Sequence, residues 1–186
     1  MLFIKFSRYF VDYGVRIGYK DAEIDIQTSK AWVNILETLG IIFLLHPYSN
    51  NVLKRTIKTP KVYFYDTGLV CYLTKWSSPE VTESGALLEN FAVSEIVKGY
   101  QNAGLEPYLY FYRDRDAKEI DVILEGDGKL CPLEIKKTAT PDKRIVRTFG
   151  VIDKSPLQLG TGAVLCIAEQ LGAFDRENLI VPIWAI

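Results

Sequence analysis

The sequence predicts an α/β protein with two domains, one mainly helical and the other built on a mixed sheet. Three observations support this prediction. Up to about residue 75, apolar side chains recur at helical spacing and are followed by short β-rich runs. From residue 84 to 186, one helical pattern gives way to strands in which apolar and polar residues alternate. Between the two regions, the turn-forming residues 76–80 indicate a linker.

The first domain, residues 1–75, is expected to contain three helices followed by a β-ribbon. The helices are expected at 2–13, 20–25 and 30–39, and the strands at 41–45, 54–57 and 62–65. Thr28 and Ser29 offer an N-cap for the third helix, and Gly40 offers a stop. This order of elements is that of a winged helix-turn-helix, although many small α+β units share it.

The second domain, residues 84–186, is expected to have the order α-β-β-β-α-β, with a further strand at the end. The helices are expected at 85–101 and 143–151, and the strands at 108–112, 119–124, 129–136, 163–168 and 179–184. Gly126-Asp127-Gly128 is typical of a hairpin turn between the second and third strands.

Composition excludes several classes of function. The chain has 186 residues, 48% of them hydrophobic, and a net charge of -1, so overall charge predicts no partner. No apolar run approaches the roughly 20 residues of a membrane span. Three distant cysteines form no disulfide framework, and a cytoplasmic protein with inert thiols is expected. With no P-loop motif there is no ATP site in this chain, and a single histidine, His46, weakens any Ser-His-Asp scheme.

The hairpin of the second domain could carry a metal site. Asp121 leaves its strand on the face opposite Ile120, and folding about the turn sets it roughly across from Leu133 and Glu134. Pro132 could supply the one-residue irregularity that brings both carboxylates to one face. Together with the Ile135 carbonyl they would suit Mg²⁺ or Mn²⁺. Lys136 would then lie beside the metal and hold an attacking water. The alternative is an exposed strand face with alternating charges, which needs no function.

Glu89 is the candidate for a third acidic member of this site. It falls within the apolar face of the helix at 85–101, where an acid is costly unless it is paired or bound to metal. The alternative is that Glu89 pairs with a basic residue such as Arg113 and is purely structural.

Four separated motifs then carry a resemblance. They are PKVYFYDTGL at 60–69, GALLENF at 85–91, YR at 112–113 with EID at 119–121, and LEIK at 133–136. From about residue 20 to its end, the chain resembles the C-terminal region of prokaryotic AAA-type ATPases of unassigned function.

The resemblance implies a winged helix followed by a domain with the PD-(D/E)XK nuclease-like fold. The nuclease pattern falls on Glu89, Asp121, Glu134 and Lys136, and all four residue types are present. The ATPase domain that precedes this region in the family is missing from this chain, so a fragment or a truncated product is expected, and an ATP-driven role is in doubt.

Basic clusters are the second kind of functional candidate. Lys54, Arg55, Lys58 and Lys61 lie between residues 51 and 62 with no acid among them, and on a wing hairpin they could contact DNA phosphates. A second cluster follows the hairpin and consists of Lys136, Lys137, Lys143, Arg144 and Arg147. The alternative for both clusters is a solvated face.

These observations lead to three hypotheses. The first is a Mg²⁺- or Mn²⁺-dependent nuclease module that acts on DNA as the C-terminal part of a AAA-type ATPase. The second is a non-catalytic module that binds DNA or a protein through a nuclease-like fold. The third is a protein-interaction or self-assembly domain, favoured by a pI of about 5.9, which is unusual for a stand-alone DNA binder.

Overall fold

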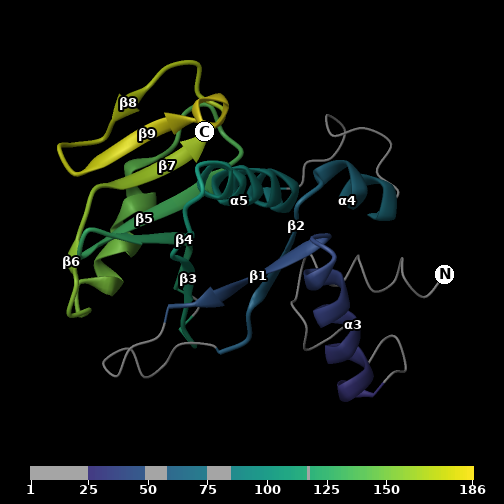
Figure 1. Cartoon of the computed structure of the whole chain (residues 1–186). Coiled ribbons are helices and arrows are strands. Elements are labelled where there is room, and N and C mark those ends of the chain that lie inside the picture. Colours follow the sequence, from purple (N-terminus) through teal and green to yellow (C-terminus); the bar gives the residue numbers. More distant parts are fainter. Residues whose placement is uncertain (1–24, 49–57, 75–84, 117) are drawn as a thin grey trace. The chain divides into compact units, whose positions relative to one another are not determined.

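The computed structural model describes residues 25–48, 58–74, 85–116 and 118–186 (Figure 1). The described residues combine helices with nine strands that pair partly in parallel and partly in antiparallel fashion, which confirms the predicted α/β class. The helices expected at 2–13 and 20–25, the strand at 54–57 and the linker at 76–80 lie outside the described residues. The winged helix and the boundary between residues 75 and 84 therefore stay predictions.

The described residues belong to two compact units. The first contains residues 25–45, 59–74 and 85–94, and the second contains 46–48, 58, 95–116 and 118–186. Strand β1 and helix α5 each start in the first unit and end in the second. The elements that start in the first unit are α3 (Ile26–Thr38), β1 (Ile42–Pro47), β2 (Lys61–Phe64), α4 (Thr67–Thr74) and α5 (Gly85–Asn102).

Helix α3 begins earlier than the sequence suggested. Asp25, and not Thr28 or Ser29, is its N-cap, because the Asp25 carboxylate accepts hydrogen bonds from the backbone N–H of Gln27 (2.9 Å) and Thr28 (3.0 Å). Ser29 is instead buried within the helix. The helix ends as predicted, since Gly40 adopts a φ of 65°, a conformation that glycine reaches without strain.

Strands β1 and β2 form the antiparallel ribbon of the first unit. Ile42 lies opposite Phe64 and Leu45 opposite Lys61, so the partner of β2 among the described residues is β1. One face of the ribbon packs in a core with α3, α4 and the start of α5. This core consists of Val33, Ile42, Val62, Phe64, Val70, Leu73 and Leu87. His46 lies at the end of β1 that belongs to the second unit, opposite Tyr110.

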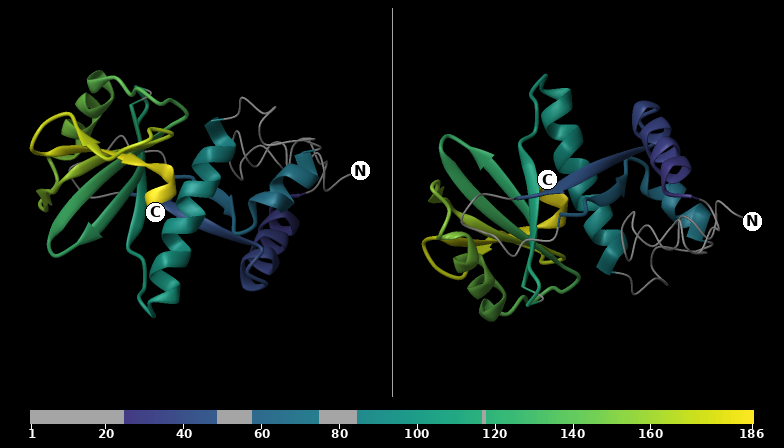
Figure 2. Two further views of the ribbon diagram at one scale, coloured as in Figure 1. Left: turned by 90° about the horizontal axis from the view of Figure 1, so that it is seen from above. Right: turned by 90° about the horizontal axis from the view of Figure 1, so that it is seen from below.

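The second unit is a mixed sheet with a short helix on it. Its strands are β3 (Leu109–Arg113), β4 (Glu119–Gly126), β5 (Lys129–Lys136), β6 (Gln158–Leu159), β7 (Gly162–Cys166), β8 (Gly172–Ala173) and β9 (Asn178–Pro182). They follow the order β3-β4-β5-β7-β9-β8, with β6 beside β5 (Figure 2). Strands β5, β7 and β9 run parallel, so their C-terminal ends meet at one edge of the sheet.

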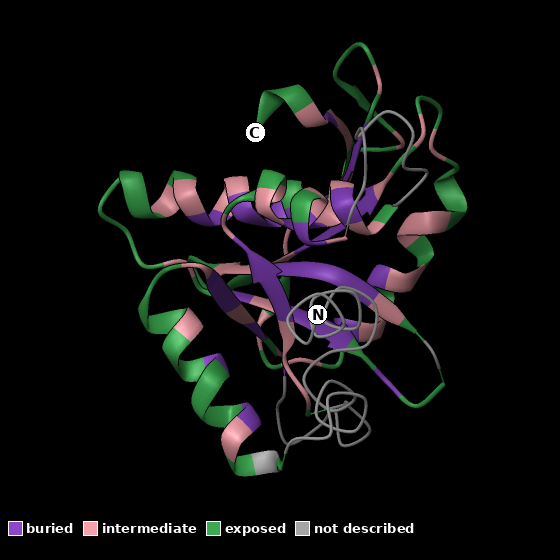
Figure 3. Ribbon diagram, turned by 90° about the vertical axis from the view of Figure 1, so that its right-hand side faces the viewer, coloured by how far each residue is buried: buried purple, intermediate pink, exposed green. Residues whose placement is uncertain are grey.

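The 3₁₀ helix η1 (Lys143–Ile152) contributes Phe149 and Ile152 to the core of this sheet, where they meet Ile120 and Leu130. The helix expected at 143–151 is therefore present, although as 3₁₀ turns. A last 3₁₀ turn, η2 (Ile183–Ala185), follows β9. Figure 3 shows that the strands are largely buried and that the helices keep exposed faces.

The hairpin between β4 and β5 forms where the sequence predicted it. Asp127 and Gly128 have φ values of 50° and 72°, and Gly126 pairs with Lys129 across the turn. Two successive positive φ angles are typical of the type I′ turn, whose twist matches the twist of the strands that it joins. The turn fixes the register of β4 against β5.

Candidate active site on strands β4 and β5

The register of the hairpin brings the two predicted carboxylates together. Pairing runs without a break from Gly126–Lys129 to Val122–Leu133, and Asp121 and Glu134 directly follow its last pair. Both carboxylates contact the Lys136 ammonium, so they lie close together. Pro132 lies in the regular register, so the irregularity expected there is absent.

The irregularity occurs between β3 and β4 instead. Tyr110 lies opposite Ile123 and Tyr112 opposite Ile120, so β4 holds one residue more than β3 in this interval. The extra residue lies at Asp121 and Val122, and it lets both Ile120 and Ile123 reach one core. Bulges of this kind re-aim side chains next to functional sites, and this one lies at the first carboxylate.

Asp121 is a buried member of the hairpin. Its side chain is 9% exposed, and its Oδ2 accepts a hydrogen bond of 2.9 Å from the backbone N–H of Ile135. The sequence placed Asp121 on a functional face away from the core, yet the side chain also serves the fold through this bond. Because the N–H and C=O of one strand residue point to the same side, the Ile135 carbonyl also faces the Asp121 side of β5.

Glu134 is buried to a similar degree, with an 11% exposed side chain. Its Oε1 accepts a hydrogen bond of 2.7 Å from Lys136 Nζ, whereas its shielded Oε2 has no hydrogen-bond partner. Burial raises the pKa of Glu134, and the hydrogen bond and charge of Lys136 oppose that rise only in part. A buried carboxylate oxygen without a partner is costly, so this position favours a cation or a polar ligand.

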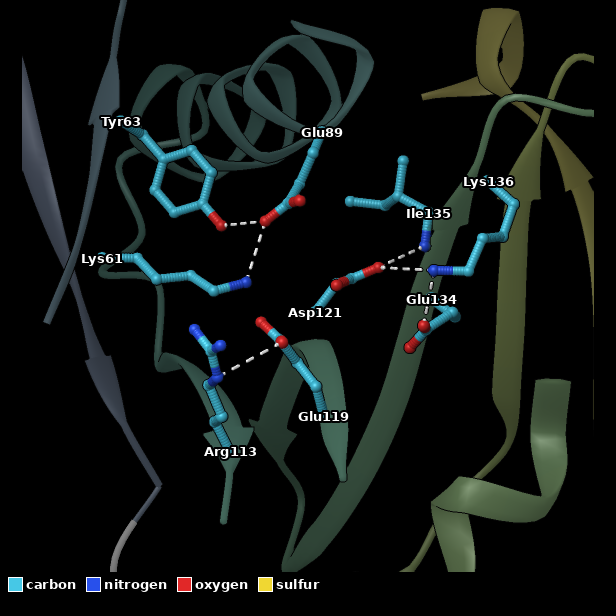
Figure 4. Close-up of polar contacts among 9 residues, drawn as sticks. All are labelled: Lys61, Tyr63, Glu89, Arg113, Glu119, Asp121, Glu134, Ile135 and Lys136. Carbon is cyan, nitrogen blue, oxygen red and sulfur yellow. Dashed lines mark hydrogen bonds and ion pairs between the residues drawn. The ribbon is translucent and has the colours of Figure 1, made fainter. Parts of the chain in front are cut away.

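Lys136 joins the two carboxylates on the site face. Its Nζ lies 2.7 Å from Glu134 Oε1 and 3.6 Å from Asp121 Oδ2, and its side chain is 40% exposed (Figure 4). The three side chains come from two adjacent strands, which restrict their positions. The two carboxylates are buried, and the ammonium group that contacts both of them is partly exposed.

A second ion pair continues the same face. Arg113 on β3 lies opposite Glu119 on β4, and its Nε lies 3.6 Å from Glu119 Oε2. Figure 4 shows Glu119 and Asp121 on one side of β4, and the Glu119 charge contributes to the raised pKa of Glu134. Glu119 was not among the predicted site residues. The cross-strand register was the missing signal, because alternation alone does not say which residues of β3 and β4 face each other.

Two parts of the chain match known protein families. Residues 84–186, more than half of the chain, match a family described as Domain of unknown function (DUF4143). The chain belongs to the DUF4143 family. DUF4143 domains occur at the C-terminus of AAA-ATPase-like proteins. Residues 17–80 match a second family, described as Domain of unknown function (DUF8612).

Two uncharacterized mycobacterial proteins are similar to the chain over most of its length. One comes from Mycobacterium bovis and the other from Mycobacterium tuberculosis, and each is 30% identical over 160 residues. The match covers 83% of this chain but 34% of each relative, so the chain spans about a third of their length. No solved structure matches the chain.

The DUF4143 region also contains Glu89, which the first unit holds in a local network. Glu89 Oε1 accepts hydrogen bonds from Tyr63 Oη (2.6 Å) and Lys61 Nζ (2.9 Å), both on β2. The pairing with Arg113 that the sequence left open is replaced by the pairing with Lys61. A role for Glu89 at the Asp121 site stays a prediction.

The neighbouring Asn90 ties the same two segments together. It accepts a hydrogen bond from the Phe64 N–H (2.8 Å) and donates one to the Phe64 carbonyl (3.0 Å). Asn90 and Ser94 are both buried although their side chains are polar. These contacts explain why two of the motifs occur together, since PKVYFYDTGL supplies β2 and GALLENF supplies the side chains that bind it.

The predicted DNA-binding residues are only partly described. Lys54 and Arg55 lie outside the described residues, Lys58 is exposed, and Lys61 is 21% exposed and paired with Glu89. Their contact with DNA stays a prediction.

In the DUF4143 region, the second basic cluster is partly neutralised. Lys143 pairs with Asp175 at 2.9 Å, and Arg144 pairs with Asp142 at 2.7 Å. These contacts lower the pKa of both carboxyls to about 2. The pairings favour a structural role for Lys143 and Arg144.

The donor set of the site agrees with a small oxygen-binding cation. The described residues contain no group of three or more His, Cys, Asp or Glu arranged to hold a metal. Asp121 and Glu134 supply two carboxylates, one of which has an unpartnered oxygen, and the Ile135 carbonyl lies on the same side. Mg²⁺ is commonly bound by one or two carboxylates and keeps several waters, so a third acid is not required.

Within the described chain, no helix has the length and apolarity to span a membrane.

Proposed function

We propose that this chain is a divalent-metal-dependent nuclease module that acts on DNA. The observation that carries the proposal is the buried, unpartnered Glu134 Oε2 beside Asp121 and Lys136. The fold tolerates such an oxygen when a ligand supplies the missing interaction. Two carboxylates from adjacent strands with a lysine on the same face suit a reaction that has to neutralise charge on a phosphate.

The proposed cofactor is Mg²⁺ or Mn²⁺, held by Asp121 and Glu134 with the Ile135 carbonyl. When bound, such a cation would polarise a phosphodiester and lower the pKa of a bound water. The carboxylates fix their positions through strand pairing, and the Ile135 N–H holds Asp121 Oδ2. No histidine is needed for this chemistry.

Lys136 is proposed to hold the attacking water in position. Its ammonium already contacts both carboxylates and is 40% exposed, so it can reach a solvent molecule above the buried acids. An ammonium in this place donates hydrogen bonds to a water or to a phosphate oxygen and stabilises the negative charge that develops during hydrolysis. Glu89 is proposed to orient a second water or metal.

The order of elements supports a nuclease-like fold for the DUF4143 region. Helix α5 is followed by three antiparallel strands, with Asp121 on the second and Glu134 and Lys136 on the third, and then by η1 and a parallel strand. Family membership and the greater length of the relatives support a further proposal, that the chain works as the C-terminal part of a AAA-type ATPase. In that setting Lys54, Arg55, Lys58 and Lys61 would bind DNA phosphates.

The test is DNA cleavage by wild type and by Asp121→Asn. Supercoiled and branched DNA are incubated with Mn²⁺, and nicking is followed on a gel. The matched control is Asp127→Asn, the same substitution at the exposed tip of the same hairpin, where the φ of 50° suits asparagine. The proposal predicts metal-dependent nicking by wild type and by Asp127→Asn, and none by Asp121→Asn.

Two results would contradict it. Equal nicking by Asp121→Asn would mean that the activity comes from a contaminant. An inactive wild type on every substrate would favour the second hypothesis, a non-catalytic DNA- or protein-binding module.

A further inference from the structure

We propose that Arg113 is the residue that binds the DNA phosphate at this site, and that Glu119 holds Arg113 in place until DNA arrives. The inference rests on the proposed function and names a binding residue for the same site. It starts from the register, which places Arg113 and Glu119 opposite each other on β3 and β4. Glu119 and Asp121 leave β4 on one side, so the guanidinium borders the carboxylate site (Figure 4).

Exposure separates the roles of these side chains. Asp121 and Glu134 are 9% and 11% exposed, whereas Arg113 is 49% and Glu119 is 32% exposed. The carboxylates therefore form the floor of the site, and the guanidinium lies where it opens to solvent. A DNA phosphate that approaches from solvent would meet the more exposed Arg113 before it reaches the carboxylates.

The Arg113 guanidinium also forms only a weak ion pair with Glu119. Glu119 is its partner among the described residues, and the contact joins Arg113 Nε to Glu119 Oε2 at 3.6 Å, which is longer than a strong charged hydrogen bond. An exposed pair of this kind contributes little to stability. The two terminal nitrogens of the fork remain suited to a phosphate, whose oxygens match guanidinium geometry.

The charges of the site make this binding depend on metal. With all groups ionised, the carboxylates of Glu119, Asp121 and Glu134 and the cations Arg113 and Lys136 leave one net negative charge. Such a site repels a phosphodiester. One divalent cation reverses the net charge to a single positive charge, which one phosphodiester neutralises. The site should therefore attract DNA only after the metal has bound.

The test measures binding of a short fluorescein-labelled DNA duplex by fluorescence anisotropy, in Mn²⁺ and in EDTA. A gel of the same samples reports cleavage. The variants are Arg113→Gln, Arg113→Lys and Glu119→Gln. The matched control is Arg176→Gln, which removes the same charge from an exposed residue before β9, at the opposite end of the parallel strands from Lys136. Thermal unfolding checks that each variant is folded.

We expect Arg113→Gln to weaken Mn²⁺-dependent binding about tenfold and to reduce the slope of log K against log salt by about one, since one phosphate contact is lost. Arg113→Lys should recover part of the affinity, because it keeps the charge and loses the fork. Glu119→Gln should tighten binding, because it frees the guanidinium and removes a repulsive charge. Arg176→Gln should change the affinity less than about twofold.

The outcomes separate this inference from the proposed function. If wild type binds DNA with Mn²⁺ but does not cut it, and Arg113→Gln loses that binding, the phosphate site stands and the nuclease proposal fails. If wild type cuts DNA and Arg113→Gln matches it in affinity and rate, the nuclease proposal stands and this inference is overturned. Equal losses in Arg113→Gln and Arg176→Gln, or no metal-dependent binding by wild type, would also overturn it.

Discussion

Replacing Asp121 by asparagine or by alanine separates its structural role from its proposed metal-binding role. Asp121 Oδ2 accepts a buried hydrogen bond of 2.9 Å from the Ile135 N–H. Asparagine keeps an acceptor for this bond but loses the charge, whereas alanine leaves the N–H without a partner. Both substitutions remove the carboxylate that the metal needs.

The magnitudes follow from the strength of that bond. A buried hydrogen bond to a charged group contributes about 1.5–3 kcal/mol, and one between neutral groups about 0.5–1.5 kcal/mol. Asp121→Asn should therefore lower the free energy of unfolding by about 1 kcal/mol. Asp121→Ala should lower it by about 2–3 kcal/mol, because the buried N–H is also left unsatisfied. Loss of the 3.6 Å contact with the partly exposed Lys136 adds little.

The assay is urea denaturation in EDTA, followed by circular dichroism, with the unfolding midpoint compared at a common slope. Mn²⁺ is then added at about 100 times its dissociation constant, which should stabilise wild type by about 2.7 kcal/mol and should stabilise neither variant. An alanine variant as stable as wild type in EDTA would refute the structural role of Asp121. An asparagine variant that Mn²⁺ stabilises as strongly as wild type would refute its metal-binding role.

Two buried polar side chains, Asn90 and Tyr112, should contribute measurably to stability. Asn90→Ala should lower the free energy of unfolding by about 2–4 kcal/mol, since the buried Phe64 N–H and C=O lose their partners, whereas Ser94→Ala on the same helix should cost less than about 1.5 kcal/mol. Urea denaturation of both variants checks this, and equal losses would contradict it. Burial and the neighbouring Asp114 raise the pKa of Tyr112 to about 12. The neutral phenol is therefore favoured in the folded chain, so stability should fall as pH rises from about 10 to 12. Tyr112→Phe should remove this loss, and an identical high-pH profile for the two proteins would contradict the expectation.

The sequence predicted the hairpin well because the signals there are local. The turn at 126–128 has a composition that only a few turn types accept, and it fixes the register of β4 against β5. Once that register is set, Asp121 and Glu134 follow directly after the last paired residues of the two strands. The return strand, 129–136, agrees with its prediction to the residue.

The features that the sequence did not predict depend on contacts between distant segments. The extra residue at Asp121 is a property of the β3–β4 pairing, which joins strands across a loop with no strict turn signature. Asn90 and Ser94 look like members of a solvated helix face, yet Asn90 meets the Phe64 peptide and both are buried. The Asp25 cap went unrecognised because Thr28 and Ser29 are equally good capping residues on propensity alone.

The most direct test of a metal site between β4 and β5 is a Mn²⁺ soak of crystals of this protein, with anomalous diffraction to locate the ion. We predict a peak between the carboxylates of Asp121 and Glu134. The ion should lie within bonding distance of one Asp121 oxygen and of Glu134 Oε2, the oxygen that now lacks a partner. A soaked crystal with no peak there, and with Lys136 Nζ still bonded to Glu134 Oε1, would contradict the account, because the carboxylates would then bind the Lys136 ammonium and no metal ion.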